Sequence, residues 1–272
     1  MTRKQLIAQI LNKRSFLCIG LDTDITKIPQ DFLKYDDPVY EFNKLIIDAT
    51  KDFCVAYKLN TAFYEALGDK GWNSMYKTAC YIPRNCLKIA DAKRGDIGNT
   101  SEMYARAFFK TMMFDAITIS PYMGYDSVAP YLQYPDKWII LLALTSNEGS
   151  KDFQLLKWGR KYFFEIVISK ALEWGTPDNV MFVVGATHPD KLSRIRALAP
   201  DHFLLMPGVG AQGGDLDTIA EIGLNKEVGL LVSSSRDILY AGSQKDFLIK
   251  ATKKAYQIQR DMELTLKTQN LI

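Results

Sequence analysis

Histidine is scarce in this chain, and its scarcity limits the chemistry that the protein can perform. Among 272 residues there are two histidines. His188 lies at the start of a predicted helix, and His202 lies just before a predicted strand, at the strand end where sites rarely form. Acid–base catalysis by histidine, or a catalytic triad, is therefore not expected.

Cysteine is also rare, and its pattern excludes two kinds of site. The four cysteines show no Cys-x-x-Cys spacing, and three of them (Cys18, Cys54 and Cys86) fall in apolar runs, where a free cysteine behaves as a small hydrophobic residue. No Cys, His and carboxylate cluster has the spacing of metal ligands. We expect no disulfide scaffold, no metal site and a reducing, cytoplasmic location.

Long apolar runs and blocks of one charge are missing as well. No apolar run approaches the ~20 residues that span a bilayer, and Lys13 with Arg14 interrupts the place where a signal peptide needs its apolar block. The net charge is +3, with no basic block or basic stripe interleaved with aromatics. We therefore expect neither a membrane nor a nucleic acid as partner, and a small anionic molecule is compatible with the charge.

Eight short and nearly continuous apolar runs alternate with helical patterns along the chain. Continuous runs indicate strands buried on both faces, as in a parallel sheet. Eight βα units in about 250 residues is typical of a (β/α)₈ TIM barrel, and an open doubly wound sheet, the alternative, usually has fewer strands. We predict one α/β barrel domain over residues 1–272, with a short N-terminal helix and the active site at the C-terminal ends of the strands. The runs are 16–21, 53–57, 86–90, 116–119, 138–144, 180–184, 203–206 and 229–232.

A charged stretch follows the third run and is the first candidate for chemistry. Asp91 and Lys93 are two residues apart, so a strand would direct both side chains to one face, and Asp96 follows after a glycine. Two acids and a base in a small volume are costly unless they are used. A solvated, salt-bridged loop is the alternative interpretation.

The same stretch is predicted to enter a helix at Asn99 or Thr100. Glu102 lies three residues after Asn99, in a spacing similar to a capping box.

Lys58 ends the preceding predicted strand and can reach the same volume. Adjacent second and third strands would make a Lys58–Asp91–Lys93 chain of alternating charges, in which each group keeps its partner ionised. Taken alone, Lys58 could equally be a lysine that snorkels at a strand end. Such an array suits a step that forms a carbanion, because a lysine can stabilise and protonate the developing charge.

A glycine-rich segment, 207–215, follows the seventh run and contains a formal G-x-G-x-x-G. A dinucleotide fingerprint belongs near the start of a βαβ unit with an acid about 20 residues later, and here the next strand ends in Arg236. The loops after strands seven and eight of many barrels bind a phosphate. We therefore predict a phosphate site to which Arg236 adds a bidentate contact; a flexible turn with an exposed arginine is the alternative.

These residues together resemble the orotidine 5′-phosphate decarboxylase family. The run Asp91-x-Lys93-x-x-Asp96-Ile97-Gly98-Asn99-Thr100 is similar to its signature, and Lys58, the segment 207–214 and Arg236 are similar to other parts of it. The Asp-x-Lys-x-x-Asp motif is shared with hexulose-phosphate synthases. The Ile-Gly-Asn-Thr continuation and Lys58 narrow the resemblance to the decarboxylases. The segments 92–95 and 63–65 and the long connection after Ser146 resemble the longer bacterial branch.

The resemblance implies a reaction and roles for residues. Orotidine 5′-monophosphate would lose CO₂ from C6 to give uridine 5′-monophosphate, the last step of pyrimidine synthesis, with no metal or organic cofactor. Lys93 would protonate the C6 carbanion, and Asp91 would lie beside the departing carboxylate. Lys58 would bridge Asp91 and the ribose, Asp22 would bind ribose hydroxyls, and Ser146 would contact the pyrimidine.

The resemblance also implies phosphate contacts and a partner subunit. Gln212 and Arg236 would hold the phosphate, with Ser235 in a position where the family often has glycine. Asp96 and Thr100 would reach into the site of a second copy, which implies a homodimer. The loop 210–214 and the connection 147–158 are the candidate lids.

Two other functions stay open at this point. The first is a related barrel lyase or aldol enzyme that acts on a phosphosugar through the same motif. The second is a barrel that binds a nucleotide without catalysis.

Overall fold

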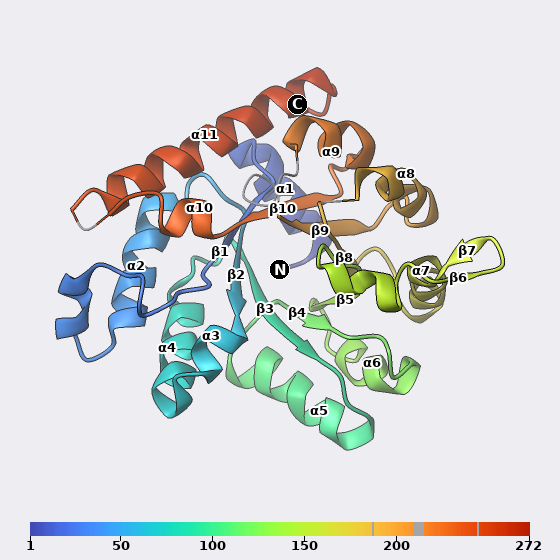
Figure 1. Ribbon diagram of the computed structural model, residues 1–272, viewed down its shortest axis with the longest axis horizontal. Helices are drawn as coiled ribbons and strands as arrows, with labels where there is room; N and C mark the ends of the chain where they lie inside the picture. The colour runs from blue at the N-terminus through green and yellow to red at the C-terminus, as the bar shows by residue number, and fades with distance from the viewer. Residues whose placement is uncertain (187, 209–214, 244) are drawn as a thin grey trace.

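The computed structural model describes residues 1–186, 188–208, 215–243 and 245–272. Eight parallel strands form a closed barrel in the order β1-β10-β9-β8-β5-β4-β3-β2, with helices around it (Figure 1). The predicted TIM barrel is thereby confirmed. The barrel strands are β1 (Leu17–Gly20), β2 (Ala56–Asn60), β3 (Leu87–Arg94), β4 (Ala116–Ile119), β5 (Trp138–Leu144), β8 (Val180–Val184), β9 (Phe203–Pro207) and β10 (Leu230–Ser234).

The strands are apolar because the barrel has no solvent-facing side. Every residue of β1, β4, β8 and β10 is buried, and the largest buried side chains include Trp138 and Phe203, whose rings meet edge to face at 6.3 Å. Inward side chains fill the barrel, and outward side chains pack under the helices. Because the strands themselves are apolar, the polar residues lie at the strand ends, where they can form a site.

Among the helices that surround the barrel, α2 (Pro38–Thr50) begins where the sequence supplies a cap. Asp37 accepts a hydrogen bond from the Tyr40 N–H, and Pro38 is the first helical residue. The α-helices are α1 (Arg3–Lys13), α2 (Pro38–Thr50), α3 (Thr61–Glu65), α4 (Gly68–Tyr81), α5 (Gly98–Arg106), α6 (Tyr125–Leu132), α7 (Phe163–Trp174), α8 (Pro189–Leu198), α9 (Leu216–Gly223), α10 (Arg236–Leu239) and α11 (Phe247–Thr268). Short 3-10 helices lie at Gln30–Lys34 and Glu148–Asp152, and a short π-helix lies at Ala107–Thr111. In the described residues, no helix is long and apolar enough to cross a membrane.

Strand β3 differs most from the prediction. It continues beyond Ala90 to Arg94, and Ala90 pairs with Ile117 of β4 while Arg94 pairs with Ile119. Three residues of β3 therefore lie opposite the single residue Thr118, which is a β-bulge. The charged stretch begins inside a strand, in a bulge, and not in the loop that follows.

The entry into α5 was also predicted incorrectly. The helix begins at Gly98, and its N-cap residue, Ile97, makes no side-chain capping hydrogen bond. The Asn99–Glu102 capping box is therefore wrong. Gly98 adopts a φ of 53°, a conformation that glycine tolerates and that lets the chain turn into the helix directly.

The long connection after β5 has structure of its own. It contains the turn Glu148–Asp152 and an antiparallel hairpin of β6 (Lys157–Trp158) and β7 (Lys161–Tyr162). The hairpin projects from the barrel beside α7 (Figure 1). The other predicted lid, 210–214, lies outside the described residues.

Candidate active site

An alternating chain of charges crosses the C-terminal ends of β2 and β3. Lys58 Nζ donates to Asp91 Oδ2 at 2.8 Å, and Lys93 Nζ donates to Asp91 Oδ1 at 2.6 Å. The register explains the meeting, because Lys58 pairs with Ile89 and Asn60, the last residue of β2, pairs with Asp91, so Asp91 lies level with the end of β2. The structure thus brings together the three residues of the predicted array.

The two lysines of this array differ in their access to solvent. Lys58 is 5% exposed, whereas the Lys93 side chain is 49% exposed. Lys58 therefore holds the Asp91 carboxylate from the buried side, whereas the Lys93 ammonium is accessible to a ligand.

The charges of the array are held by one another. Burial alone would raise the pKa of Asp91, but the ammonium groups of Lys58 and Lys93 lower it well below its usual range. Burial alone would lower the pKa of Lys58, but the carboxylates of Asp91 and Asp22 raise it above its ordinary value. Asp91 therefore stays ionised and Lys58 stays protonated near neutral pH.

A cavity of about 410 Å³ opens beside the array. This volume is in the range of small-molecule sites. The ends of β5, β8 and β9 contribute an apolar wall opposite the charges. The lining residues are Lys58, Asp91, Lys93, Thr118, Leu142, Thr145, Ser146, Asn147, Gln154, Val183, Leu205 and Pro207.

Asp22 lies next to this cavity without lining it. Its Oδ1 is 3.5 Å from Lys58 Nζ, but within the described residues this buried oxygen accepts no hydrogen bond. The loop that carries it is held by a side chain, since the Tyr64 hydroxyl donates to the backbone carbonyl of Leu21 at 2.8 Å. A carboxylate oxygen in this state can accept a ligand hydroxyl.

Ser146 lines the cavity at the end of β5, and a glycine keeps it there. Gly185 follows β8, and a Cβ built on it would lie 2.6 Å from the Ser146 backbone nitrogen. Only glycine allows the two loops to approach this closely.

The two predicted phosphate residues lie at the end of β10. Ser235 Oγ donates to the carbonyl of Gly20 at 3.2 Å, which ties this end to β1. Arg236 is exposed at the start of α10, and its guanidinium has no hydrogen bond or ion pair with any residue that the structure describes. Neither residue lines the cavity. Gln212 lies outside the described residues.

Asp96 and Thr100 are not brought to the array of their own chain. Asp96 is half-buried and accepts the Ile97 N–H at 2.8 Å, while Thr100 is exposed on α5. Neither residue is among those that line the cavity.

Sequence reasoning missed Thr118 and Gln154. Thr118 Oγ1 donates to Asp91 Oδ1 at 3.1 Å and accepts the Lys93 N–H at 2.9 Å. A signal existed for it, because Thr118 is the one hydroxyl residue in the apolar run 116–119. Gln154 reaches the cavity from the long connection and accepts the Thr145 N–H at 2.7 Å, and nothing local in the sequence marks it.

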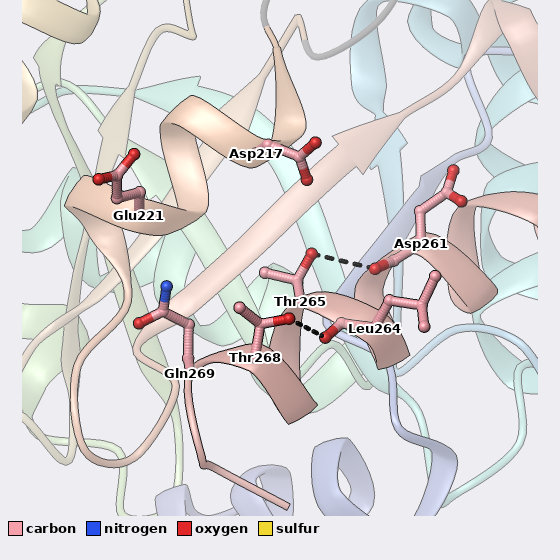
Figure 2. A pocket seen from close by; sticks show the side chains of 7 residues that line it. All are labelled: Asp217, Glu221, Asp261, Leu264, Thr265, Thr268 and Gln269. Carbon is pink, nitrogen blue, oxygen red and sulfur yellow. Dashed lines mark hydrogen bonds between the residues drawn. The ribbon is translucent and has the colours of Figure 1, made fainter.

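A larger hollow, of about 590 Å³, lies between α9 and α11, away from the charge array (Figure 2). It is lined by Asp217, Glu221 and Asp261, among others, and Thr265 and Thr268 donate their hydroxyls to carbonyls of their own helix. Among the described residues that line the hollow there is no basic side chain, so it lacks the paired charges of Lys58, Asp91 and Lys93. Within the described residues, no group of three or more His, Cys, Asp or Glu side chains is placed to hold a metal ion.

Comparison with known proteins finds a family that matches most of this chain. The family model for "Orotidine 5′-phosphate decarboxylase / HUMPS family" matches residues 15–247. The chain is 52% identical over 267 residues to the orotidine 5′-phosphate decarboxylase of Phocaeicola vulgatus, which covers 97% of this chain and 98% of the relative. It is 53% identical over 276 residues to that of Parabacteroides distasonis, which covers 100% and 99%.

A solved structure is similar over the same extent. The OMP decarboxylase of Leishmania donovani has a TM-score of 0.81 and 36% identity, and the match covers 96% of this chain and 99% of that one. The similarity thus extends over the whole barrel and not only over the charged end of β3.

Proposed function

Since this chain belongs to the orotidine 5′-phosphate decarboxylase / HUMPS family, and as a carboxy-lyase converts orotidine 5′-monophosphate to uridine 5′-monophosphate, we propose that Lys93 protonates the carbon that loses the carboxylate. The family description names two kinds of enzyme, the orotidine 5′-phosphate decarboxylases and HUMPS, which acts on a phosphosugar. The two full-length bacterial relatives are decarboxylases, which favours decarboxylation over a phosphosugar reaction.

The observation that carries this proposal is the half-exposed ammonium of Lys93 beside the cavity. Asp91 holds it by a 2.6 Å hydrogen bond, and Lys58 balances the second oxygen of Asp91 from the buried side. When CO₂ leaves C6, the electron pair stays on the ring carbon, and a fixed ammonium stabilises that charge and then supplies the proton. The step needs a proton donor and fixed charges, so we propose that no metal or organic cofactor takes part.

The rest of the substrate extends from this point toward β1 and β10. We assign the pyrimidine to Ser146, which lines the cavity, and the ribose hydroxyls to Asp22, whose Oδ1 accepts no hydrogen bond from the described residues. We assign the phosphate to Arg236, whose guanidinium has no partner among the described residues, and we propose Ser235 and Gln212 as further phosphate contacts. Phosphate contacts remote from C6 can then be used to lower the barrier at C6.

A homodimer completes this proposal. Neither Asp96 nor Thr100 lines the cavity of its own chain, which fits a role in the site of a second copy. Exposed apolar residues, Ile97 and Met103, flank them and provide surface for such a contact.

Two broader statements belong to the same proposal. We propose that residues 1–272 act as one domain, because α11 packs on α2 and β1, and Leu6 and Ile10 of α1 are buried in the common core. We also propose a cytoplasmic location, which fits four free cysteines, of which Cys18, Cys54 and Cys86 are buried.

The test is the loss of orotidine 5′-monophosphate absorbance with the wild type and with Lys93→Ala. We expect turnover by the wild type in the presence of a chelator, and no measurable turnover by Lys93→Ala at the same protein concentration. Binding of uridine 5′-monophosphate by Lys93→Ala serves as the control for a folded site. Full activity of Lys93→Ala would refute the role of Lys93.

The dimer has its own test, in which two inactive variants are mixed. Lys93→Ala and Asp96→Ala subunits form hybrid dimers with one intact site if Asp96 completes the neighbouring site. Random exchange should then restore about a quarter of wild-type activity, since half of the dimers are hybrids and half of their sites are intact. No recovery despite demonstrated subunit exchange would refute the shared site.

A further inference from the structure

The bulge in β3 places one hydroxyl against both charged residues of the motif. Asp91, Ala92 and Lys93 lie opposite Thr118 alone, because Ala90 pairs with Ile117 and Arg94 with Ile119. A bulge interrupts the ladder of backbone hydrogen bonds and leaves its extra residues without ladder partners. Something other than the backbone of β4 must therefore fix the position of Lys93.

Thr118 supplies that contact with its side chain. Its Oγ1 accepts the backbone N–H of Lys93 at 2.9 Å and donates to Asp91 Oδ1 at 3.1 Å. The residue is 1% exposed, and as a β-branched side chain on a strand it has few available rotamers. The hydroxyl is thus a fixed point between the backbone of one charged residue and the carboxylate of the other.

The backbone of Lys93 needs such a fixed point. Its φ is 48°, in the left-handed region that a lysine rarely adopts and that persists only when neighbouring contacts enforce it. With this backbone, the Lys93 ammonium reaches the same Asp91 oxygen to which Thr118 donates. A small rotation at Lys93 would carry the long side chain away from Asp91.

We propose that Thr118 is a positioning residue for the decarboxylation, which sets the place of the Lys93 ammonium through the Lys93 backbone and the Asp91 carboxylate. Its only hydroxyl proton is donated to Asp91, so it acts through the charged pair and not as a donor to the substrate. The proposal rests on the proposed function, because it assumes that Lys93 delivers the proton.

The test compares Thr118→Val, which removes the hydroxyl and keeps the branched shape, with Thr118→Ser, which keeps the hydroxyl. A lost hydrogen bond to a charged group predicts a kcat lower by about tenfold to a hundredfold in Thr118→Val, with a KM for orotidine 5′-monophosphate within about twofold of wild type. Thr118→Ser should keep kcat within about threefold of wild type. Thr118→Ala replaces the valine variant if that protein does not fold.

Two controls separate positioning from general damage. Thr50→Val removes another fully buried threonine hydroxyl, which donates to the Ile46 carbonyl at 2.7 Å and lies 2.8 Å from Tyr57 Oη. Thr50 does not line the cavity, so this variant should leave kcat unchanged. The Kd of uridine 5′-monophosphate, measured by calorimetry, should be the same in Thr118→Val and wild type, since we assign the phosphate and ribose of the product to Arg236 and Asp22 and not to the bulge.

The outcomes also distinguish this inference from the proposed function. No turnover by the wild type would mean that the proposed function fails. Turnover by the wild type with an equal kcat in Thr118→Val would overturn only the role of Thr118. The same role is overturned if Thr118→Ser is as slow as Thr118→Val, or if the loss of product binding equals the loss of kcat.

Discussion

His202, at the end of the barrel opposite the charge array, is predicted to control the stability of the fold in mild acid. The side chain is 5% exposed, and both ring nitrogens are buried without a hydrogen-bond partner among the described residues. Burial lowers the pKa of His202 from 6.5 to about 4, and the guanidinium groups of Arg3 and Arg196 add to this effect. The carboxylate of Asp201 acts in the opposite direction and raises the pKa. Substitution by leucine removes the titrating group without creating a new unsatisfied polar atom.

The direction and size of the stability change follow from the pKa values of His202 in the unfolded chain and in the folded protein. Between pH 6.5 and pH 4 the unfolded chain binds a proton at this position and the folded protein does not, so stability falls as the pH falls. Each pH unit in that window removes about 1.4 kcal/mol, so the fold should lose about 2 kcal/mol between pH 7 and pH 5 through His202 alone. Below pH 4 both states are protonated and this loss stops.

Urea unfolding at pH 7 and pH 5, followed by circular dichroism, measures this difference. We expect the wild type to lose about 2 kcal/mol more than His202→Leu over this interval. His188→Leu is the matched control, since His188 is half-buried and its Nε2 lies 3.2 Å from the Thr145 carbonyl oxygen, and it should behave as the wild type. Equal losses in wild type and His202→Leu would refute the reasoning.

Two further predictions concern the walls of the site. Gly185→Ala places a Cβ about 2.6 Å from the Ser146 backbone nitrogen and should lower kcat/KM at least ~10-fold by moving Ser146; unchanged kinetics in a folded variant would contradict the assigned pyrimidine contact. Arg236→Ala should leave the melting temperature unchanged, because the guanidinium has no partner in the described part of the chain, and should lower kcat/KM for orotidine 5′-monophosphate by roughly 10- to 100-fold. The same variant should act on orotidine, which lacks the phosphate, as the wild type does, and an equal loss on orotidine would contradict the phosphate assignment.

Much of the fold was accessible from the sequence because parallel barrel strands are apolar along their whole length. The runs 116–119, 138–144 and 180–184 coincide with β4, β5 and β8. The third run ended too early in the prediction, since polar residues after Ala90 suggested a loop. The strand continues to Arg94 because its backbone pairs again with β4 beyond the bulge, which depends on the neighbouring strand and leaves no local trace.

The site was accessible in part, for a similar reason. Charged residues at strand ends must meet when the ends share one face of a barrel, so the array of Lys58, Asp91 and Lys93 could be predicted from strand positions. The contacts of Thr118 could not, because they depend on the bulge register. The entry of Gln154 into the cavity depends on how the connection after β5 folds back, which is a tertiary property.

The central claim is that Lys93 exchanges a proton with C6 of the pyrimidine. Because a catalysed step is reversible at the level of its transition state, the enzyme should also exchange the C6 hydrogen of uridine 5′-monophosphate with solvent. The measurement is the loss of the H6 signal of uridine 5′-monophosphate in D₂O, followed by proton NMR with wild type and Lys93→Ala. We expect exchange with the wild type and none above the enzyme-free rate with Lys93→Ala. Equal exchange by the two proteins, at saturating nucleotide, would contradict it.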